Sequence, residues 1–348
     1  MKGIWRFASL FDDDGGPLER ATAAGLHVGE GDTPWVELPD IAAELGLGSL
    51  SLKREDLNPS GSHKDRGVLY QVASHHRPGT RTTFVLSSSG NAAVAAARAA
   101  ACSGDRLVAF VSPRTHPAKR AKLAAGGALV VETLKPINFA RYAARVFGLP
   151  DLRGTRDPAA SIGYRSLAGE IAQDRPNVGA VFTFSSSGIS MRGLDDGFKR
   201  LGVSPSLWAV QAGECLGIVR QIDPEAPIDP ESPAGRLGIR NPPDAPALAA
   251  RLLDTGGGAV AASTDAILRW RDRLEAHDVA TSPEGCAVLA GVETAAPGLG
   301  GASVVAILTG AADQWPATES PQEDERTVRL SSYLEVRAFL IELGLEPS

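Results

Sequence analysis

Short apolar runs alternate with longer stretches of helical character along most of this chain. The apolar runs predict buried strands, and they lie at residues 49–55, 82–88, 106–112, 128–134, 179–185, 206–212 and 302–310. The helical stretches, several of them closed by glycine, lie at residues 65–75, 91–104, 116–127, 138–148, 166–174, 192–202, 263–277, 283–295 and 329–343. Strands that alternate with helices indicate crossover connections, so we expect an α/β fold with open, mostly parallel sheets.

Composition narrows the classes of protein that this chain can represent. With 43% hydrophobic and 22% charged residues, it has the profile of a soluble globular protein, and 348 residues suit two domains. The net charge of -6 argues against nucleic-acid or anionic-membrane partners. The three cysteines are far apart and lack metal-ligand spacing, so we expect reduced thiols, no metal and a cytoplasmic location. We also expect a homodimer.

Three turns that contain glycine and a hydroxyl side chain follow predicted strands. They read "SSSGN" at 87–91, "SSSGIS" at 185–190 and "LTGAAD" at 308–313. Each turn alone most often caps a helix, but backbone N–H groups and hydroxyls at helix N-termini also form phosphate sites. A lysine, Lys64, stands in "LNPSGSHKDRG" at 57–67. A lysine near such a site can bind the aldehyde of pyridoxal phosphate as a Schiff base.

These motifs, in this order, resemble the fold-type II pyridoxal-phosphate enzymes of the tryptophan synthase β superfamily, and threonine synthase most of all. The resemblance also includes "GEGDTPWVELPDIAAELG", "GIRNP" and "TSPEGCAVLAG", and it covers about residues 4–312. It implies pyridoxal 5'-phosphate as the cofactor and a small amino acid as the substrate. The block around Lys64 is its most specific part.

The resemblance assigns a role to each matching residue. Lys64 corresponds to the Schiff-base lysine and catalytic base, Asn91 to the ligand of the cofactor's phenolic oxygen, and Thr309 to the partner of its pyridine nitrogen. His63, beside the lysine, either packs against the cofactor phosphate or is a core residue. The remaining assignments are Ser88, Ser89 and Gly90 for the substrate carboxylate, and Ser186, Ser187, Gly188, Ile189 and Ser190 for the cofactor phosphate.

The sequence departs from threonine synthases at two sites that bear on specificity. The phosphate loop of that family is typically Gly-Asn-Ala-Gly-Asn, whereas Ile189 replaces a glycine here, so the loop must adopt a conformation open to isoleucine. A substrate-phosphate segment ending in Asn-Pro-x-Arg corresponds to "GTRDPAA", where Thr155 is retained in kind but Ala160 replaces the arginine. Arg156 or Arg165 would have to substitute for it.

We therefore expect a lyase similar to threonine synthase, acting by elimination or replacement at the β or γ carbon of O-phosphohomoserine or a related amino acid. The alternative is a serine or threonine ammonia-lyase, or a β-replacement enzyme of a specialised pathway. A non-catalytic binding protein is disfavoured because Lys64 and Asn91 are both present. A nucleotide-dependent dehydrogenase is disfavoured because no G-x-G-x-x-G follows a first strand.

The ligand turns also predict a domain organisation. We expect a small α/β domain at residues 51–150 inserted into a large domain built from residues 1–50 and 151–348, which ends in a tail helix. The cofactor would lie in the cleft between them. The polar run at 316–326 predicts a flexible connection to the tail.

Overall fold

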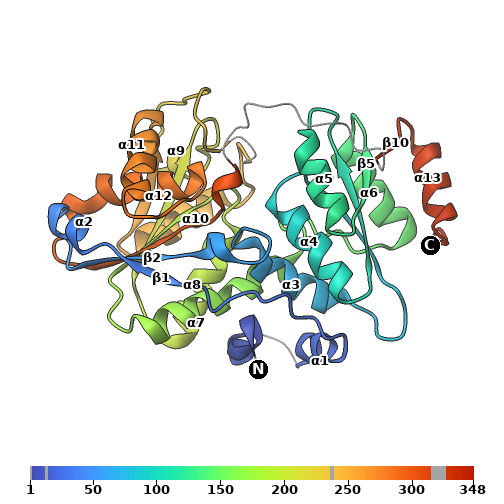
Figure 1. The fold of residues 1–348 in the computed structure, drawn as a ribbon, viewed down its shortest axis with the longest axis horizontal. Helices are drawn as coiled ribbons and strands as arrows, with labels where there is room; N and C mark the ends of the chain where they lie inside the picture. The colour runs from blue at the N-terminus through green and yellow to red at the C-terminus, as the bar shows by residue number, and fades with distance from the viewer. Residues whose placement is uncertain (1, 12–14, 236–238, 315–326) are drawn as a thin grey trace.

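The computed structural model describes residues 2–11, 15–235, 239–314 and 327–348, and it contains two separate, mostly parallel sheets (Figure 1). The larger sheet has the order β1-β2-β9-β6-β7-β8, and only β1 runs antiparallel to its neighbour. Its strands are β1 Trp35–Glu37, β2 Ser49–Lys53, β6 Ala180–Phe184, β7 Ser206–Ala212, β8 Gly258–Ala262 and β9 Ser303–Ile307. This arrangement confirms the predicted α/β fold with open, mostly parallel sheets.

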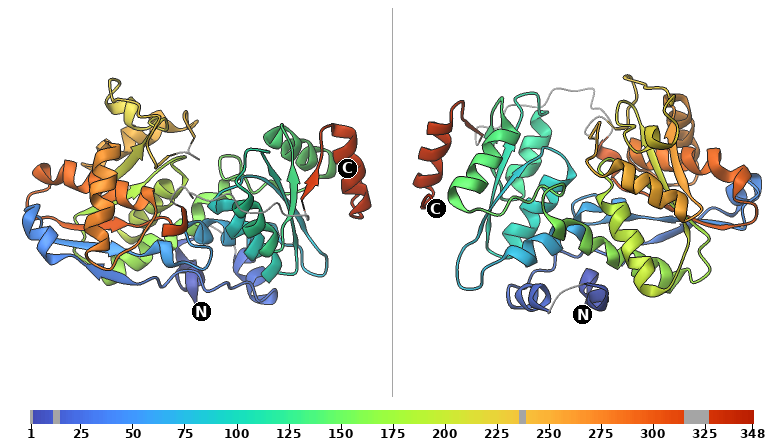
Figure 2. Two further views of the ribbon diagram at one scale, coloured as in Figure 1. Left: turned by 45° about the horizontal axis from the view of Figure 1, so that its top comes forward. Right: turned by 180° about the vertical axis from the view of Figure 1, so that it is seen from behind.

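The smaller sheet has the order β10-β5-β4-β3, with all of its pairs parallel. Its strands are β3 Thr83–Ser87, β4 Arg106–Val111, β5 Leu129–Glu132 and β10 Val328–Arg329. In Figure 2 the two sheets and their helices form two bodies side by side, joined near the N-terminal segment. Each body has its own core, because the buried apolar side chains of the two sheets fall into different clusters.

Helices cover both sheets and connect their strands. The longer ones are α1 Gly16–Ala23, α3 Lys64–His75, α4 Asn91–Cys102, α5 Pro117–Ala125, α6 Pro136–Phe147, α7 Arg165–Asp174, α8 Ile189–Leu201, α10 Ala245–Asp254, α11 Thr264–Glu275, α12 Pro283–Ala295 and α13 Tyr333–Glu342. The shorter ones are α2 Pro39–Glu44 and α9 Val219–Ile222, with the 3-10 turns η1 Gly3–Leu10, η2 Glu55–Leu57, η3 Pro158–Tyr164, η4 Ala296–Gly298 and η5 Ala312–Gln314. No helix among the described residues is long and apolar enough to cross a membrane.

Local sequence explains the ends of several helices. The N-cap of α11 is Ser263, whose hydroxyl accepts a hydrogen bond from the Ala266 amide, and helix α12 begins after Ser282 in the same way. Helix α8 begins at Ile189, earlier than its apolar pattern indicated, because Gly188 takes the left-handed conformation that starts it.

Three observations bear on the expected division into domains. Residue 51 lies inside β2, which belongs to the larger sheet. The N-terminal turn η1 contributes Trp5 to the buried cluster that contains Phe84 of the smaller sheet. Strand β10 pairs with β5, and α13 packs on α6 through Val336 and Leu340. We therefore propose that the small domain includes η1 and the tail helix.

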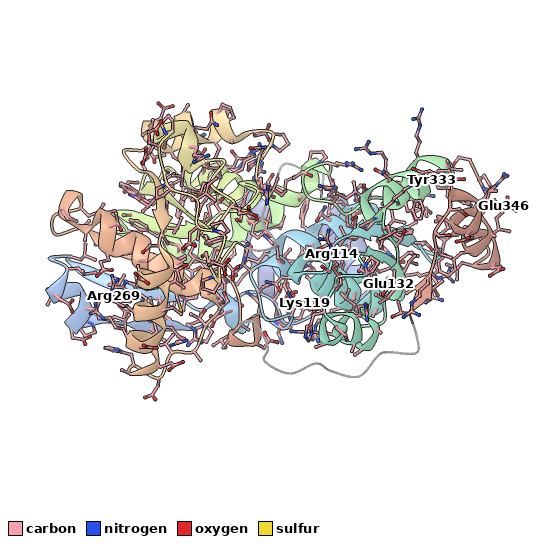
Figure 3. All side chains as sticks on the ribbon, turned by 90° about the horizontal axis from the view of Figure 1, so that it is seen from above. Arg114, Lys119, Glu132, Arg269, Tyr333 and Glu346 are labelled. Carbon is pink, nitrogen blue, oxygen red and sulfur yellow. The ribbon has the colours of Figure 1, made fainter. Side chains whose placement is uncertain are left out.

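The tail joins the smaller sheet because it covers an edge and an apolar surface that residues 83–147 would otherwise expose. The Tyr333 and Phe139 rings make an edge-to-face contact, with their centroids 4.9 Å apart. Figure 3 shows Tyr333 and Glu346 at the end of the molecule opposite Arg269 of the larger body. The polar connection predicted at 316–326 lies outside the described residues.

Candidate active site

Lys64 is the first residue of α3, and it lies where the two bodies meet. The loop before it is bonded to the segment that follows β9: Ser62 forms an isolated antiparallel bridge with Gly310, and the Ala311 amide donates to the Gly61 carbonyl at 2.9 Å. The lysine therefore stands at the carboxyl end of a central strand of the larger sheet. Ligands bind at this edge in open α/β sheets.

His63 connects Lys64 to the end of β9. Its Nδ1 lies 3.0 Å from the Thr309 carbonyl oxygen, and its backbone N–H donates to the same oxygen at 3.2 Å. Because a carbonyl can only accept, Nδ1 carries the proton. The other ring nitrogen, Nε2, lies 3.0 Å from Lys64 Nζ. The structure thus brings three of the predicted residues, His63, Lys64 and Thr309, into one bonded chain.

The surroundings of Lys64 make its amine easier to deprotonate. The Tyr164 ring centroid lies 5.8 Å from Lys64 Nζ and 5.5 Å from the His63 ring centroid. Burial lowers the pKa of Lys64 from 10.5 to about 8, since the charged form loses its hydration. Burial also holds the pKa of His63 well below its usual 6.5, with the charges of Lys64 and Arg66 acting in the same direction.

The serine-rich turns stand where the sequence placed them. Residues 88–90 follow β3, and Asn91 begins α4, with the Gly90 amide bonded to the Ser88 hydroxyl at 3.2 Å. The second turn, 185–190, follows β6 and opens α8. Gly188 has φ of +82°, whereas Ile189 is already helical, so isoleucine meets no strain at its position.

The turn η3 holds the Lys64 helix and the α8 helix together. Gly67 of α3 lies so close to η3 that a Cβ there would be 2.5 Å from Tyr164 Cε2 and 2.7 Å from the Ala160 carbonyl oxygen. In the loop before η3, a Cβ on Gly154 would lie 2.8 Å from Ile189 Cδ1. These contacts place the segment 154–164 between the lysine and the second serine turn.

A buried ionic network anchors α3 to the larger body. The Arg66 guanidinium bonds Glu55 through Nε at 2.7 Å and Glu170 through Nη2 at 2.7 Å. Glu170 also accepts from Lys53 of β2, with Nζ 2.8 Å away. The positive charges of Arg66 and Lys53 lower the pKa of Glu170 from 4.5 to about 2, against the effect of burial. The network fixes the start of α3, and with it the position of Lys64.

The segment that differs from threonine synthases offers no arginine directed at Lys64. Ala160 is buried at 4% exposure. Arg156 is exposed and pairs with Asp151 at 3.0 Å, while Thr155 is half-buried in the same turn. Arg165 begins α7, where its Nη1 donates to the Leu10 carbonyl at 3.1 Å. Either arginine would have to leave these contacts to bind a substrate phosphate.

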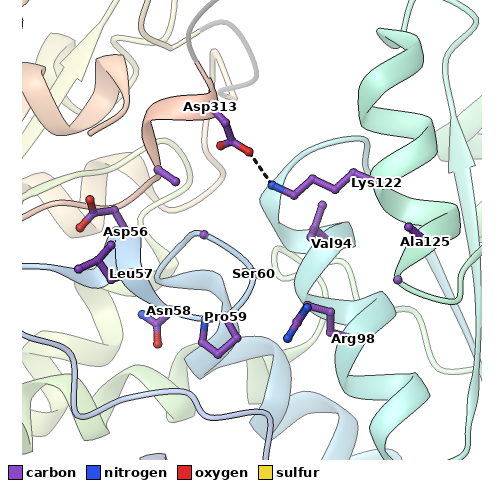
Figure 4. Close-up of a pocket in the computed structure, with 13 residues that line it drawn as sticks. Asp56, Leu57, Asn58, Pro59, Ser60, Val94, Arg98, Lys122, Ala125 and Asp313 are labelled. Carbon is purple, nitrogen blue, oxygen red and sulfur yellow. Dashed lines mark hydrogen bonds and ion pairs between the residues drawn. The ribbon is translucent and has the colours of Figure 1, made fainter. Parts of the chain in front are cut away.

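A cavity of 590 Å³ lies between the two bodies, beside the loop that leads to Lys64 (Figure 4). Its walls come from the 56–61 loop, helices α4 and α5, and residues 311 and 313. Lys122 of α5 and Asp313 form an ion pair at 2.9 Å across it, and Figure 4 shows Arg98 and Val94 on the α4 side. In this view the Lys122–Asp313 ion pair joins the two walls of the cavity.

Sequence reasoning missed Tyr164, whose ring faces the Lys64 amine, and the role of Arg66. The available signal for Tyr164 was an aromatic residue beside Arg165 in "GYRSLAGE". It also missed Ser185, a residue with 1% exposure at the end of β6 whose hydroxyl has no hydrogen-bond partner among the described residues. A buried orphan hydroxyl next to a glycine-opened helix N-terminus is a feature that a bound phosphate would explain.

The chemistry of this set fits pyridoxal phosphate. A half-buried amine with a lowered pKa stands at the carboxyl edge of the larger sheet, where the serine-rich N-terminus of α8 also lies. The serine-rich N-terminus of α4 follows β3 of the smaller sheet, and the two helix N-termini suit a phosphate and a carboxylate. Lys64, Asn91, Thr309 and the 186–190 turn are the residues that would hold the group.

Comparison with known proteins points to the same cofactor. The chain is 26% identical over 308 residues to a threonine synthase of Methanosarcina acetivorans, covering 83% of this chain and 74% of that protein. It is 28% identical over 299 residues to a threonine synthase of Halalkalibacterium halodurans, covering 82% and 83%. A crystal structure of O-ureido-L-serine synthase superposes with a TM-score of 0.70 at 22% identity, covering 84% of this chain and 92% of that one. The model of the pyridoxal-phosphate dependent enzyme family matches residues 26–310, so this chain belongs to that family and uses pyridoxal phosphate.

Proposed function

We propose that this protein is a lyase similar to threonine synthase, which carries out elimination or replacement at the β or γ carbon of an amino acid. The observation that carries the proposal is the Lys64 amine, held at a sheet edge with a pKa lowered to about 8. Relatives named threonine synthase, matched over four-fifths of this chain, support the reaction class.

Bound pyridoxal phosphate would supply an electron sink for the charge that develops on the substrate α carbon. The residues of the chain perform the remaining tasks. Lys64, once free, removes the α proton and returns a proton at the neighbouring carbon, for which a pKa near the working pH is suitable. The 88–90 turn and the N-terminus of α4 bind the substrate carboxylate. The turn 186–190, at the N-terminus of α8, binds the cofactor phosphate.

The neutral hydroxyl of Thr309 favours this reaction class over transamination. A carboxylate at that place would keep the ring nitrogen protonated and deepen the electron sink, whereas a hydroxyl does so less strongly. Elimination needs the negative charge only briefly, because the departing group removes it. Tyr164 and His63 exclude water from one side of the lysine, since both are buried.

The identity of the leaving group is the open choice within this proposal. Threonine synthases act on a phosphorylated substrate, but here Ala160 is buried, Arg156 pairs with Asp151, and Arg165 bonds Leu10. These contacts favour the second candidate, an ammonia-lyase or β-replacement enzyme whose substrate carries no phosphate. A charge-assisted bond contributes about 1.5–3 kcal/mol, so its loss would weaken phosphate binding roughly tenfold to a hundredfold.

Two experiments test the proposal. Borohydride treatment of the loaded enzyme followed by peptide mapping should place the reduced cofactor on Lys64; attachment at another lysine would refute the assignment. Product analysis with O-phosphohomoserine, serine and threonine should then separate the two candidates. We expect poor turnover of O-phosphohomoserine by the wild type. If the wild type turns it over efficiently, Arg156→Ala or Arg165→Ala should abolish that turnover. Efficient turnover that survives both substitutions would contradict our account of specificity.

A further inference from the structure

His63 faces Lys64 in a single, fixed tautomer. The Thr309 carbonyl receives both the backbone N–H and the Nδ1–H of His63, at 3.2 Å and 3.0 Å. The Nε2 lone pair is therefore directed at Lys64 Nζ, 3.0 Å away. The ring is 6% exposed and lies against Tyr164, so water does not compete for Nε2. We propose that His63 is a positioning residue that holds the Lys64 amine in place, and sets its protonation state, by accepting a hydrogen bond at Nε2.

The charges around His63 agree with this direction of the bond. The positive charges of Lys64 and Arg66, both in α3, disfavour an imidazolium. The Tyr164 ring of η3 and the Thr309 carbonyl after β9 are the other groups that face the histidine. A neutral imidazole with Nδ1 protonated can only accept at Nε2, so Lys64 must donate. An acceptor stabilises an ammonium more than an amine, and His63 thereby offsets part of the effect of burial on Lys64.

A second histidine of this chain shows the contrast. His277 also directs Nδ1 at a main-chain carbonyl, that of Arg273, at 2.8 Å. Its Nε2, however, meets the Asp40 carboxylate at 2.8 Å, and the pKa of His277 is raised. With the same anchoring of Nδ1, Nε2 is therefore a hydrogen-bond acceptor beside a lysine and a hydrogen-bond donor beside an acid. What stands at Nε2 decides the role of each ring.

This inference rests on the proposed role of Lys64, and it is tested on the cofactor-free chain so that the two can fail separately. The reaction of lysine amines with a limiting acylating reagent is followed by peptide mass mapping between pH 6 and pH 11. The midpoint for Lys64 is read against that of Lys135, which is exposed in the same molecule. Borohydride labelling of the loaded enzyme separately tests where the cofactor attaches.

A matched pair of amide variants isolates the Nε2 contact. His63→Asn can keep a bond to Thr309 but is too short to reach Lys64, whereas the Oε1 of His63→Gln takes the place of Nε2. We expect the Lys64 midpoint to fall by about 1 pH unit in His63→Asn and to stay near the wild-type value in His63→Gln. His277→Gln, far from the lysine, should leave it unchanged.

Two results would overturn the inference: an unchanged Lys64 midpoint in His63→Asn, or equal shifts in both amide variants. A purely structural role for His63 would lower the thermal midpoint of both variants without separating their Lys64 titrations. If the titrations separate as expected but borohydride labels another lysine, the contact stands and the proposed function fails.

Discussion

The buried network around Arg66 allows the sharpest quantitative prediction. Arg66, Glu55 and Glu170 are each exposed by 1% or less, and the guanidinium bonds both carboxylates. Arg66→Met would leave two carboxylates in the interior with fewer partners. Removing one member of a buried ion pair typically costs about 3–5 kcal/mol.

The pKa of Glu170 indicates the pH range in which the network contributes to stability. Its pKa falls from 4.5 to about 2 on folding, because the charges of Arg66 and Lys53 outweigh the effect of burial. Because the folded pKa is the lower one, this stability is present above pH 4.5. It is lost as the pH falls through about 2.

The assay is urea unfolding of the cofactor-free chain at pH 7, since guanidinium salts would screen the charges. Arg66→Met should lower the free energy of unfolding by about 3–5 kcal/mol. The control is Arg192→Met, which breaks an exposed pair with Asp244 and should cost less than about 1 kcal/mol. Adding Glu170→Gln to Arg66→Met should restore part of the loss. A loss no larger than that of the control would refute the reasoning.

Three further predictions concern the surroundings of Lys64 and the contact between the bodies. The rate of cofactor attachment to Lys64 should rise with pH and level off above about pH 8, because only the neutral amine attacks. Stopped-flow absorbance measures this rate, and a rate that kept rising towards pH 10.5 would contradict the prediction. Gly67→Ala should lower the free energy of unfolding by about 1–3 kcal/mol, because the contact with Tyr164 outweighs alanine's helix preference; a stabilised variant in urea would contradict it. Lys122→Ala removes an exposed pair with Asp313, so the thermal midpoint should hardly change, and any loss should vanish at 1 M salt.

Much of the fold follows from local sequence. The apolar runs that predicted strands correspond to β2 to β7 and β9, and the glycine-closed helices α4 and α6 end within two residues of their predicted ends. These features are local, because alternation of strand and helix, capping and glycine termination depend on neighbours in the chain. The cofactor was also accessible from sequence, since Lys64 and the serine turns are contiguous motifs.

Tertiary structure alone decided how these parts are oriented. The sequence places His63 beside Lys64 but cannot show that the Thr309 carbonyl, 246 residues away, selects its tautomer. The sequence allowed Arg165 as a substitute ligand for a substrate phosphate, whereas in the folded chain this side chain donates a hydrogen bond to the Leu10 carbonyl. Strand β10 joined the smaller sheet because β5 had an edge to pair, which depends on strand order. Motifs state which groups are present, whereas contacts between distant segments set their direction, charge and partners.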